Sequence, residues 1–517
     1  MRARVTSAVL SSLVLGGWLT TATAQNIGID VPSESDVVPD QQAAETEELP
    51  VGTIPQPSPA RPGMVAGVTL GELYTDNLTL AADGQAKQSS WITQVQPFFR
   101  GARSGPRFSG VLDYELTGYV YAGRSRSNQV AQDLDARGTF ALVPQHLFVD
   151  GTASYGREVI NNELSSGSGT FFLDNNRANV ATGSVSPYWI QDFGKGGLLL
   201  LRYTWGKVMY DDHGISGQSP GVLNGITDST SHGVQFSLVS PDYQTWGWNV
   251  GYSDQRIEPN VGPGIDYAVA KLGTSWQVSS NVKLLAEGGK ESRYLPEGGS
   301  KKLGATFWNA GFEWSNARTH LKMLAGHRFY GRSYELSWSR TAALLTTSVS
   351  YVEQPTDLNQ QLLGRNPGQD ISAPITVPGV DIGSLRNRQV YLMKRATASA
   401  LYTMPSSSLR LAVYDERRTY LTQDNRQEKV ADAQLSWQVD VGAFTTLTPM
   451  FGWQRRQFQS GQTSYNHYSQ LALVHQLNPK DFASLRLRRD SRNVYSEVPG
   501  AHGYQANVVF VQWTHLF

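Results

Sequence analysis

The sequence predicts an all-β fold: a transmembrane antiparallel up-and-down β-barrel of about 22 strands, within a range of 18 to 24. Three observations lead to this prediction. They are an export signal at the amino terminus, a long series of strands with alternating polarity, and a final amphipathic strand that ends on Phe517. Because short turns and longer loops alternate between these strands, we expect short periplasmic turns and long extracellular loops.

The amino terminus predicts export. Met1–Arg4 contains two arginines, Ala8–Leu19 is a short apolar core, and Ala22-Thr23-Ala24 has the small-x-small form of a signal-peptidase site. Residues 1–24 are therefore expected to be a signal peptide that is cleaved after Ala24. No later stretch approaches the ~20 apolar residues that a membrane-spanning helix needs. If the chain spans a membrane, it must do so with strands.

The composition agrees with a barrel and excludes several classes of function. The chain is 40% hydrophobic with a mean hydropathy of −0.34, as expected when only one face of each strand meets lipid, although a large soluble all-β protein would be similar. Without cysteine it can form no disulfide, thiolate metal site or cysteine nucleophile. The balance of 44 basic and 44 acidic residues gives no support to nucleic-acid binding.

Catalytic and metal-binding patterns are weak. The nine histidines are scattered without metal-ligand spacing, and no nucleophile elbow or glycine-rich phosphate loop is present. We therefore expect no enzyme activity, no cofactor and no metal. A Ser–His pair of a membrane-embedded lipase is the alternative, because its members need not be close in sequence.

Residues 25–63 are predicted to be a disordered, acidic, proline-rich periplasmic segment. Between Gln25 and Pro62 there are seven acidic residues, one basic residue (Arg61) and seven prolines, and no periodic apolar pattern. A short docking motif for a periplasmic partner is the alternative. The segment is too short to be a folded plug domain.

Residues 64–517 are predicted to form the barrel. The first five expected strands are Met64–Asp76, Trp91–Gly101, Arg107–Tyr121, Gln129–Val143 and Leu147–Glu158. Short turns are expected at sites such as Pro144-Gln145 and Asn478-Pro479, and longer loops near 160–174, 211–227 and 353–388, among others. The series continues to the end of the chain.

Alternation in the carboxy-terminal third separates two faces. In 429–440, for example, Leu435 and Trp437 are on the apolar face, opposite Asp432 and Gln434. An Arg or Lys on the lipid face near the bilayer midplane costs roughly 2–4 kcal/mol, so the polar face should point to an aqueous lumen. The predicted pore-lining residues are Arg395, Arg410, Glu416, Asp432, Gln434, Gln438, Gln454, Arg456, Gln470, Arg486, Arg488, Asp490 and Arg492.

Two interpretations of the inward arginines stay open. They can form an ion-pair network with the nearby acids that fills the lumen and stiffens the barrel. Alternatively, they can line a pore in which guanidinium groups bind carboxylates and phosphates. In that case aromatic residues such as Tyr391, Tyr414 and Tyr468 would stack on sugar rings.

The final strand resembles the carboxy-terminal signal by which outer-membrane barrels are recognised for insertion. Val509, Val511, Trp513 and Phe517 share one face, and Phe510 is an apolar exception on the other. We predict that Trp513 and Phe517 form this barrel-assembly signal, although His515 departs from the usual pattern. The alternative is the edge strand of a soluble β-sandwich.

An ordered series of motifs resembles one known family. It comprises Tyr74-Thr75-Asp76-Asn77, Trp91 to Pro97, Leu142-Val143-Pro144, Gly326 to Gly331 and Ser348 to Tyr351. These motifs are similar to those of outer-membrane porins encoded with PEP-CTERM/exosortase exopolysaccharide systems, although Gln96-Pro97-Phe98 departs from the proline-glycine expected there. The resemblance implies an envelope role linked to polysaccharide, without an established substrate.

We therefore expect a porin-like channel in the outer membrane of a Gram-negative bacterium, linked to exopolysaccharide export or to passage of saccharides and small polar solutes. The alternative is a non-conducting structural or adhesive barrel that binds a partner through its loops, above all 353–388. The expected partners are outer-membrane lipid, the barrel-assembly machinery, and polysaccharide or periplasmic export components, but no nucleic acid.

Overall fold

The computed structural model describes residues 63–123, 127–167, 169–174, 176–211, 226–241, 245–295, 299–363, 389–421, 426–495 and 501–517. The predicted signal peptide and all of the predicted acidic segment except Gly63 lie outside the described residues. Most of the predicted loops at 211–227 and 353–388 also lie outside them.

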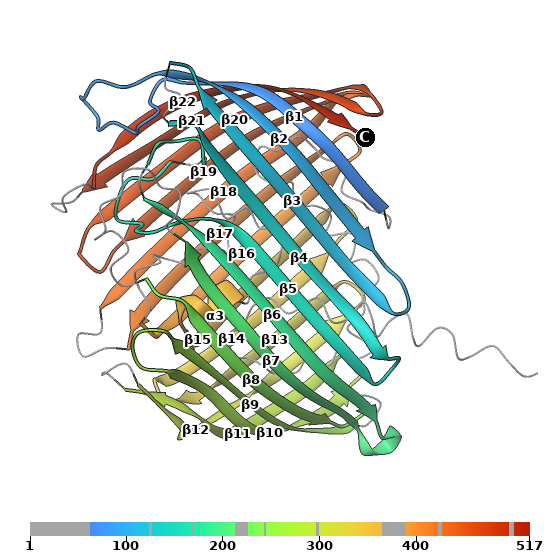
Figure 1. The fold of residues 1–517 in the computed structure, drawn as a ribbon. Helices are drawn as coiled ribbons and strands as arrows, with labels where there is room; N and C mark the ends of the chain where they lie inside the picture. Colours follow the sequence, from blue (N-terminus) through green and yellow to red (C-terminus); the bar gives the residue numbers. More distant parts are fainter. Residues whose placement is uncertain are drawn as a thin grey trace, which may run out of the picture.

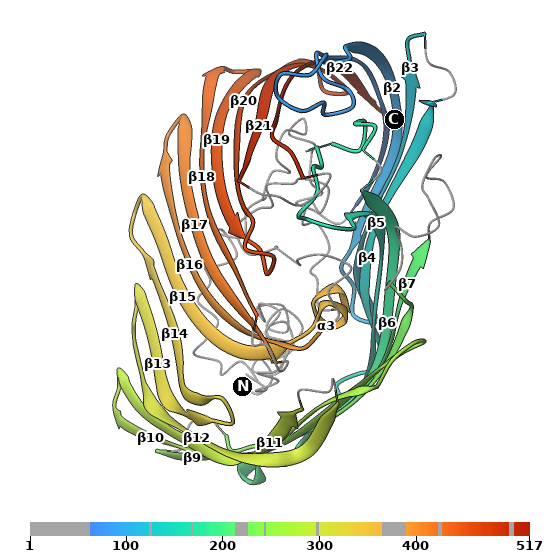
Figure 2. The same cartoon turned by 90° about the vertical axis from the view of Figure 1, so that its left-hand side faces the viewer.

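A single antiparallel sheet of 22 strands closes on itself (Figures 1 and 2). This confirms the predicted fold class and strand number. The strands are β1 (Gly63–Thr75), β2 (Ser90–Arg103), β3 (Phe108–Tyr121), β4 (Gln129–Val143), β5 (Leu147–Val159), β6 (Arg177–Asp192), β7 (Leu198–Asp211), β8 (Ser229–Val239), β9 (Trp246–Pro259), β10 (Ile265–Ser279), β11 (Val282–Tyr294), β12 (Ser300–Asn316), β13 (Thr319–Arg328), β14 (Gly331–Thr341), β15 (Leu345–Thr356), β16 (Tyr391–Met404), β17 (Ser407–Tyr420), β18 (Gln427–Gly442), β19 (Thr445–Gln457), β20 (Thr463–Asn478), β21 (Asp481–Tyr495) and β22 (Tyr504–Leu516).

Pairing of the first strand with the last closes the barrel. The β1–β22 register runs from Gly67 opposite Leu516 to Thr75 opposite Val508. Just beyond it, the backbone N–H of Phe517 donates to the carbonyl oxygen of Ala66 at 2.9 Å. The sheet therefore has no free edge, which allows its backbone hydrogen bonds to be satisfied within lipid.

The first five strands begin and end within two residues of their predicted bounds. Two connections differ from the expectation. β13 and β14 are joined by only Phe329 and Tyr330, at the end of the barrel where long loops were predicted. After β15, the short helix α3 (Leu358–Leu363) begins the predicted 353–388 loop and lies inside the ring of strands (Figure 2).

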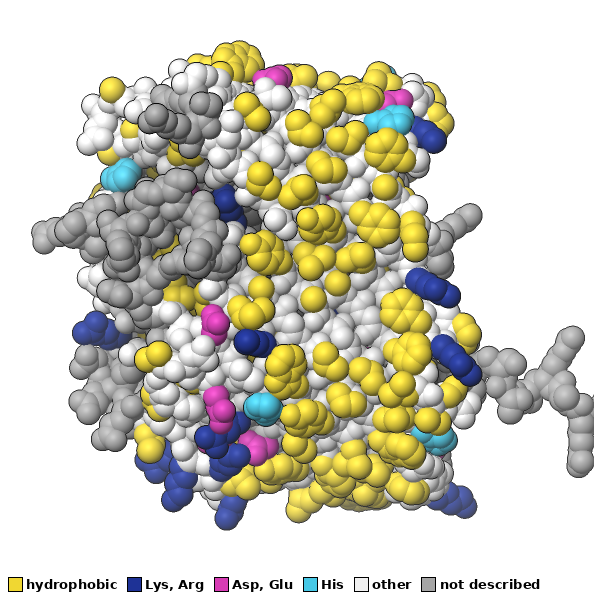
Figure 3. Space-filling model, viewed as in Figure 1, with side chains coloured by type: hydrophobic (Ala, Val, Ile, Leu, Met, Phe, Trp, Pro, Cys, Tyr) yellow, Lys and Arg dark blue, Asp and Glu magenta, His cyan; other side chains and the backbone are white. Residues whose placement is uncertain are grey.

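The outer face of the barrel is largely apolar. Apolar side chains cover much of the face seen in Figure 3. On the far wall, Leu411, Leu435 and Phe451 are directly opposite one another on β17, β18 and β19, and are 45%, 39% and 57% exposed. The next residue along β18, Gln434, is on the inner face. Among the described residues, no helix is long and apolar enough to cross a membrane.

The carboxy terminus lies at the end of the barrel where the short turns are (Figure 1), and two aromatic contacts lie at this end. Trp246 and Trp276 stack with their ring centroids 5.3 Å apart. His515, which departs from the expected terminal pattern, stacks on Trp513 at 5.7 Å, and its Nδ1 lies 2.8 Å from a carboxylate oxygen of Asp481. The polar ring of His515 therefore has both an aromatic and an acidic partner at this end of the barrel. Aromatic side chains at the ends of outer-membrane barrels form girdles at the membrane interfaces.

An arginine substitution should destabilise the barrel much more on the outer face of the wall than on the inner face. Leu435→Arg places a charge on the apolar outer face and should lower the free energy of unfolding in lipid vesicles by roughly 2–4 kcal/mol. The matched control, Gln434→Arg, adds the same side chain on the inner face, where Ala412 and Gly452 are its opposite neighbours. Urea titration should show that the control loses less than about half as much free energy of unfolding as Leu435→Arg does. Equal losses in the two variants would contradict the assignment of faces.

Candidate functional site in the barrel lumen

The barrel is flattened, so that β2–β7 face β15–β21 across the lumen (Figure 2). Two segments lie between these walls near the long-loop end: residues 160–167, 169–174 and 176, which we call the lumenal loop, and α3. The site consists of the inner face of β16–β21 and these two segments. Each strand residue is placed by the strand alternation, since directly opposite residues in an antiparallel sheet share a face.

All thirteen predicted pore-lining residues lie on the inner face of their strands. The register assigns this face, because they alternate with exposed outer residues such as Leu411 and Phe451 and are opposite one another in pairs such as Arg395–Glu416 and Asp432–Gln454. Whether they line a conducting path stays a prediction.

Glu416 on β17 is the centre of one charged cluster. Its Oε2 accepts hydrogen bonds from Arg395 Nε at 2.6 Å and from the hydroxyl of Tyr414 at 2.5 Å, and its Oε1 binds Arg418. Arg418 also lies 3.6 Å from a carboxylate oxygen of Glu428. These side chains are buried against one another, so each carboxylate is neutralised where water is scarce.

A second cluster lies on β20–β22. Arg488 pairs with Asp490 at 2.8 Å and also lies over the ring of Tyr468 at 5.3 Å. Arg486 lies over the ring of Phe510 at 4.9 Å. Guanidinium groups held between carboxylates and aromatic faces keep both their charge and a fixed orientation.

The opposite wall of the lumen also carries charged side chains that form ion pairs. Arg100 on β2 binds Asp113 at 2.9 Å and Glu115 at 2.5 Å, both on β3. Farther along, Arg202 on β7 binds Asp150 on β5 at 2.9 Å. The lumen therefore presents ion pairs from both walls, and both signs of charge line it.

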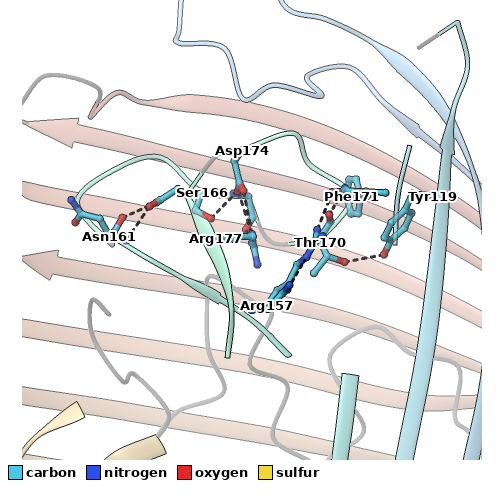
Figure 4. A network of polar contacts seen from close by, with 12 residues as sticks. Tyr119, Arg157, Asn161, Ser166, Thr170, Phe171, Asp174 and Arg177 are labelled. Atoms are coloured by element: carbon cyan, nitrogen blue, oxygen red, sulfur yellow. Dashed lines mark hydrogen bonds and ion pairs between the residues drawn. The ribbon is translucent and has the colours of Figure 1, made fainter. Parts of the chain in front are cut away.

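Hydrogen bonds hold the lumenal loop in a defined shape (Figure 4). Asp174 accepts hydrogen bonds from the Ser166 hydroxyl at 2.8 Å and the Gly167 N–H at 2.9 Å, and it pairs with Arg177 at 3.3 Å. The Tyr119 hydroxyl on β3 lies 3.0 Å from the Thr170 hydroxyl. The loop predicted near 160–174 is thus folded inward and anchored.

Arg492 connects this loop to the arginine-bearing wall. From β21 it donates to the carbonyl oxygens of Asn162, Glu163 and Leu164 at 3.1, 2.8 and 2.5 Å. Tyr504 on β22 donates to the carbonyl oxygen of Ser166 at 2.7 Å. Sequence reasoning placed Arg492 on the inner face but missed this role, because nothing local relates it to residues more than 300 positions away.

Apolar packing strengthens the same attachment. Phe171 of the loop meets Phe510 of β22 edge-on, with ring centroids 5.6 Å apart, and packs with Leu78, Leu80 and Tyr119 in one buried cluster. Phe510 was the apolar exception on the inner face of the last strand. Its partner is therefore the lumenal loop, and the exception was the available sequence signal for a segment inside the barrel.

α3 is held against β6 and β7. Leu358 and Leu362, one helical turn apart, are buried with Ile160, Val180 and Val208. The N–H of Gln360 donates to Asp357 Oδ1 at 2.9 Å, and Gln360 Nε2 donates to Gln255 on β9 at 2.8 Å. Together with the lumenal loop, α3 narrows the lumen near its long-loop end.

Asp357 is fully buried at the start of α3. Burial disfavours the charged form and raises the pKa of this carboxyl to about 6. The hydrogen bond from the Gln360 N–H lowers the pKa, but its effect is smaller than that of burial. Its protonation state therefore changes near neutral pH, at the point where α3 enters the lumen.

Several buried polar atoms on the inner face of β20 and β21 have no protein partner among the described residues. They are Ser464 Oγ, Gln470 Oε1, Ser484 Oγ and Arg492 Nε. Buried polar atoms are almost always hydrogen-bonded, so these atoms can bind water or a polar solute. Within the described ranges, no group of His, Cys, Asp or Glu side chains could hold a metal ion.

The closed antiparallel sheet, its apolar outer face and its polar lumen define the architecture of an outer-membrane β-barrel. No family model and no curated protein matches the sequence. Among solved structures, the chain is similar to the FrpB iron transporter from Neisseria meningitidis, with 10% identity, 88% of this chain and 81% of that chain covered, and a TM-score of 0.48.

Two further structures are similar. The ferric enterobactin receptor of Pseudomonas aeruginosa has 10% identity, covers 88% of this chain and 82% of its own, and has a TM-score of 0.46. The anion-selective porin from Comamonas acidovorans has 11% identity, covers 88% of this chain and 100% of its own, and has a TM-score of 0.30. The assignment of the fold rests on the strand pairing of this chain.

Arg492 should control the position of the lumenal loop. Arg492→Ala removes three hydrogen bonds to carbonyl oxygens, and we expect faster hydrogen–deuterium exchange in residues 160–167 while the barrel keeps its heat-dependent gel mobility. The control is Asn493→Ala, an exposed outer neighbour on the same strand. Unchanged exchange in Arg492→Ala would show that the loop is held without this residue.

The docking of α3 should depend on pH. Because the pKa of Asp357 is raised in the folded state, the docked helix is most stable below the ordinary pKa of the carboxyl and loses stability as pH rises through about 6. Exchange in α3 should therefore speed up between about pH 4 and about pH 7, after correction for intrinsic rates, and should change little at higher pH. Asp357→Asn keeps an oxygen for the Gln360 N–H and should remove this dependence; its persistence would exclude Asp357 as the cause.

Proposed function

We propose that this protein is an outer-membrane channel that passes saccharides or other small polar solutes and serves an exopolysaccharide system. The observation that carries the proposal is the contrast between the two faces of β16–β21. Apart from charged residues toward the long-loop end, the outer face bears Leu and aromatic side chains such as Leu435 and Phe451, whereas the inner face bears arginines paired with carboxylates. Such a wall separates lipid from a polar path.

The chemistry of the inner face suits hydroxyl-rich and anionic solutes. Arg395 and Arg488 each have a fixed acid partner and an aromatic ring beneath them, so both guanidinium groups are held in place. A guanidinium has five donors, and those of Arg488 that Asp490 does not use can bind hydroxyl, carboxylate or phosphate oxygens. Nearby unpartnered atoms, such as Gln470 Oε1, add acceptor sites for hydroxyl groups.

The lumenal loop and α3 favour small solutes over a polymer. Both lie in the lumen near the long-loop end and are held there by buried contacts. Passage of a polysaccharide would require at least one of them to move. The link to PEP-CTERM/exosortase exopolysaccharide systems, the removal of residues 1–24 and the assembly role of Trp513 and Phe517 rest on the sequence alone and are part of this proposal.

A second candidate is a structural or adhesive barrel that does not conduct. The inward fold of the lumenal loop and α3 favours it, because these segments fill part of the lumen with packed side chains. In that case the charged clusters on β16–β22 would stiffen the wall. Conductance across a planar bilayer separates the two candidates, since only a channel produces defined current steps.

Charge reversal on the inner face should change ion preference. We expect the double variant Arg486→Glu, Arg488→Glu to shift the reversal potential in a salt gradient toward cations, because the local field acts on ions in a water-filled path. Arg332→Glu makes the same charge change on the exposed outer face of β14 and should leave the reversal potential unchanged.

The outcomes distinguish the candidates. A folded wild-type barrel without current supports the structural barrel. Current with an unaltered reversal potential in the double variant would show that these arginines lie outside the conducting path. Loss of folding in the double variant would instead show that the ion-pair clusters are essential to the barrel.

A further inference from the structure

Three basic side chains are directly opposite one another on the outer face of adjacent strands. Lys394 on β16 is opposite Arg417 on β17, and Arg417 is opposite Lys429 on β18. All three alternate with the buried inner residues of their strands, such as Met393 and Glu416. Like charges directly opposite in a sheet destabilise it unless an anion lies between them.

Two further basic residues lie on the outer face of this wall, out of register with the first three. Arg455 on β19 and Arg489 on β21 are also on the outer face and exposed. We call these five side chains the basic belt: Lys394, Arg417, Lys429, Arg455 and Arg489. Each belongs to the half of its strand that is nearer the long-loop end of the barrel.

The basic belt is poorly neutralised. Lys394 pairs with Glu353 at 3.1 Å, Arg455 lies over the ring of Tyr465, and Arg489 donates to the amide oxygen of Gln505. Within the described part of the chain, Arg417, Lys429, Arg455 and Arg489 have no carboxylate partner. The belt is thus a strip of excess positive charge on the outside of the wall.

Some outer charges on β9–β12 are paired. There, Arg256 pairs with Glu258 at 2.6 Å, and Lys302 pairs with Asp254 at 2.7 Å and with Asp266 at 3.5 Å. Lys290 on β11 and the directly opposite pair Arg293 and Lys301 are also exposed there and have no acid partner among the described residues. Opposed basic residues therefore occur at two places at this end of the barrel, and the basic belt is distinguished by the depression next to it.

A depression of about 490 Å³ lies in the same wall between β17 and β21. Leu411, Leu435, Phe451 and Trp453 form its apolar part. Arg489 of the basic belt lines it together with other polar residues, His467, Ser469 and Ser491. The depression thus combines an apolar surface of the kind that meets acyl chains with a cation next to it.

We propose that the outer face of β17–β21 binds a phosphorylated lipid of the leaflet at the long-loop end. Its acyl chain lies along the depression against Phe451 and Trp453. Its phosphate groups lie between Arg489, Arg455 and the opposed pair Arg417 and Lys429. Cations near a membrane surface attract anionic headgroups, and this anion relieves the repulsion between the opposed basic residues.

A lipid fits better than a free anion or a protein. Leu411, Leu435 and Phe451 of the depression belong to the apolar outer face, so a soluble partner could not reach them in an embedded barrel. The inference requires that the barrel is embedded, but it does not require that the lumen conducts. The two proposals can therefore fail independently.

Lipid binding can be measured on the full chain in phosphatidylcholine nanodiscs, with diphosphoryl lipid A as the probe and native mass spectrometry as the readout. The test variant replaces Arg417, Lys429, Arg455 and Arg489 with Gln. The matched control replaces four outward basic residues elsewhere on the wall, Lys207, Lys290, Arg332 and Arg340, with Gln. Heat-dependent gel mobility shows whether each variant is folded.

We expect the test variant to lose affinity for the probe by about tenfold or more, and the control to bind as the wild type does. Equal binding by the test variant and the wild type would overturn the proposal. So would equal binding of phosphatidylcholine, or displacement of the probe by equimolar inorganic phosphate, which would indicate a site for a free anion.

If the fourfold variant does not fold, the double variant Arg455→Gln, Arg489→Gln gives the same test with less change to the wall. It should lose affinity while the current steps of the barrel, where present, stay unchanged. Retention of full affinity in this variant would also overturn the proposal.

Discussion

Closure of the sheet by β1 and β22 is the constraint on which the rest of the structure depends. In lipid, each unpaired backbone N–H or C=O costs several kcal/mol, so a sheet can cross a bilayer only when it has no edge. The pairing from Gly67–Leu516 to Thr75–Val508 removes that edge. It also sets which face of each strand is outside, because a shift of one residue would exchange the two faces of a strand.

Once the faces are set, each side chain meets one of two environments. Outer residues such as Phe451 meet lipid, and inner residues such as Glu416 meet ion-pair partners. The residues that break the polarity pattern of their face indicate where other groups bind. Inner Phe510 indicates the segment that folds into the lumen, and the unpaired outer cations indicate an anion at the membrane surface. Departures from a strict pattern are expected at functional sites.

The sequence predicts the barrel well because the signals are local. Strand alternation and turn residues act over a few positions, so β4 was predicted with its observed bounds, Gln129–Val143. The inward folds of the lumenal loop and α3 could not be predicted in the same way. They depend on contacts such as that between Arg492 and Glu163, which are 329 positions apart. The spacing of Leu358 and Leu362 was the one local indication of α3.

Closure within the outer membrane is tested most directly by a cross-link across the β1–β22 seam. Thr69 and Thr514 are directly opposite, with their hydroxyl oxygens 2.8 Å apart, and the chain has no cysteine of its own. With both replaced by Cys, oxidation of the outer-membrane fraction should join the two ends of the barrel and change its mobility on denaturing gels. Leu70→Cys with Thr514→Cys, which places the thiols on opposite faces, should not. Absence of the Thr69–Thr514 link in the assembled protein, or recovery of the protein in the soluble periplasm, would contradict the account.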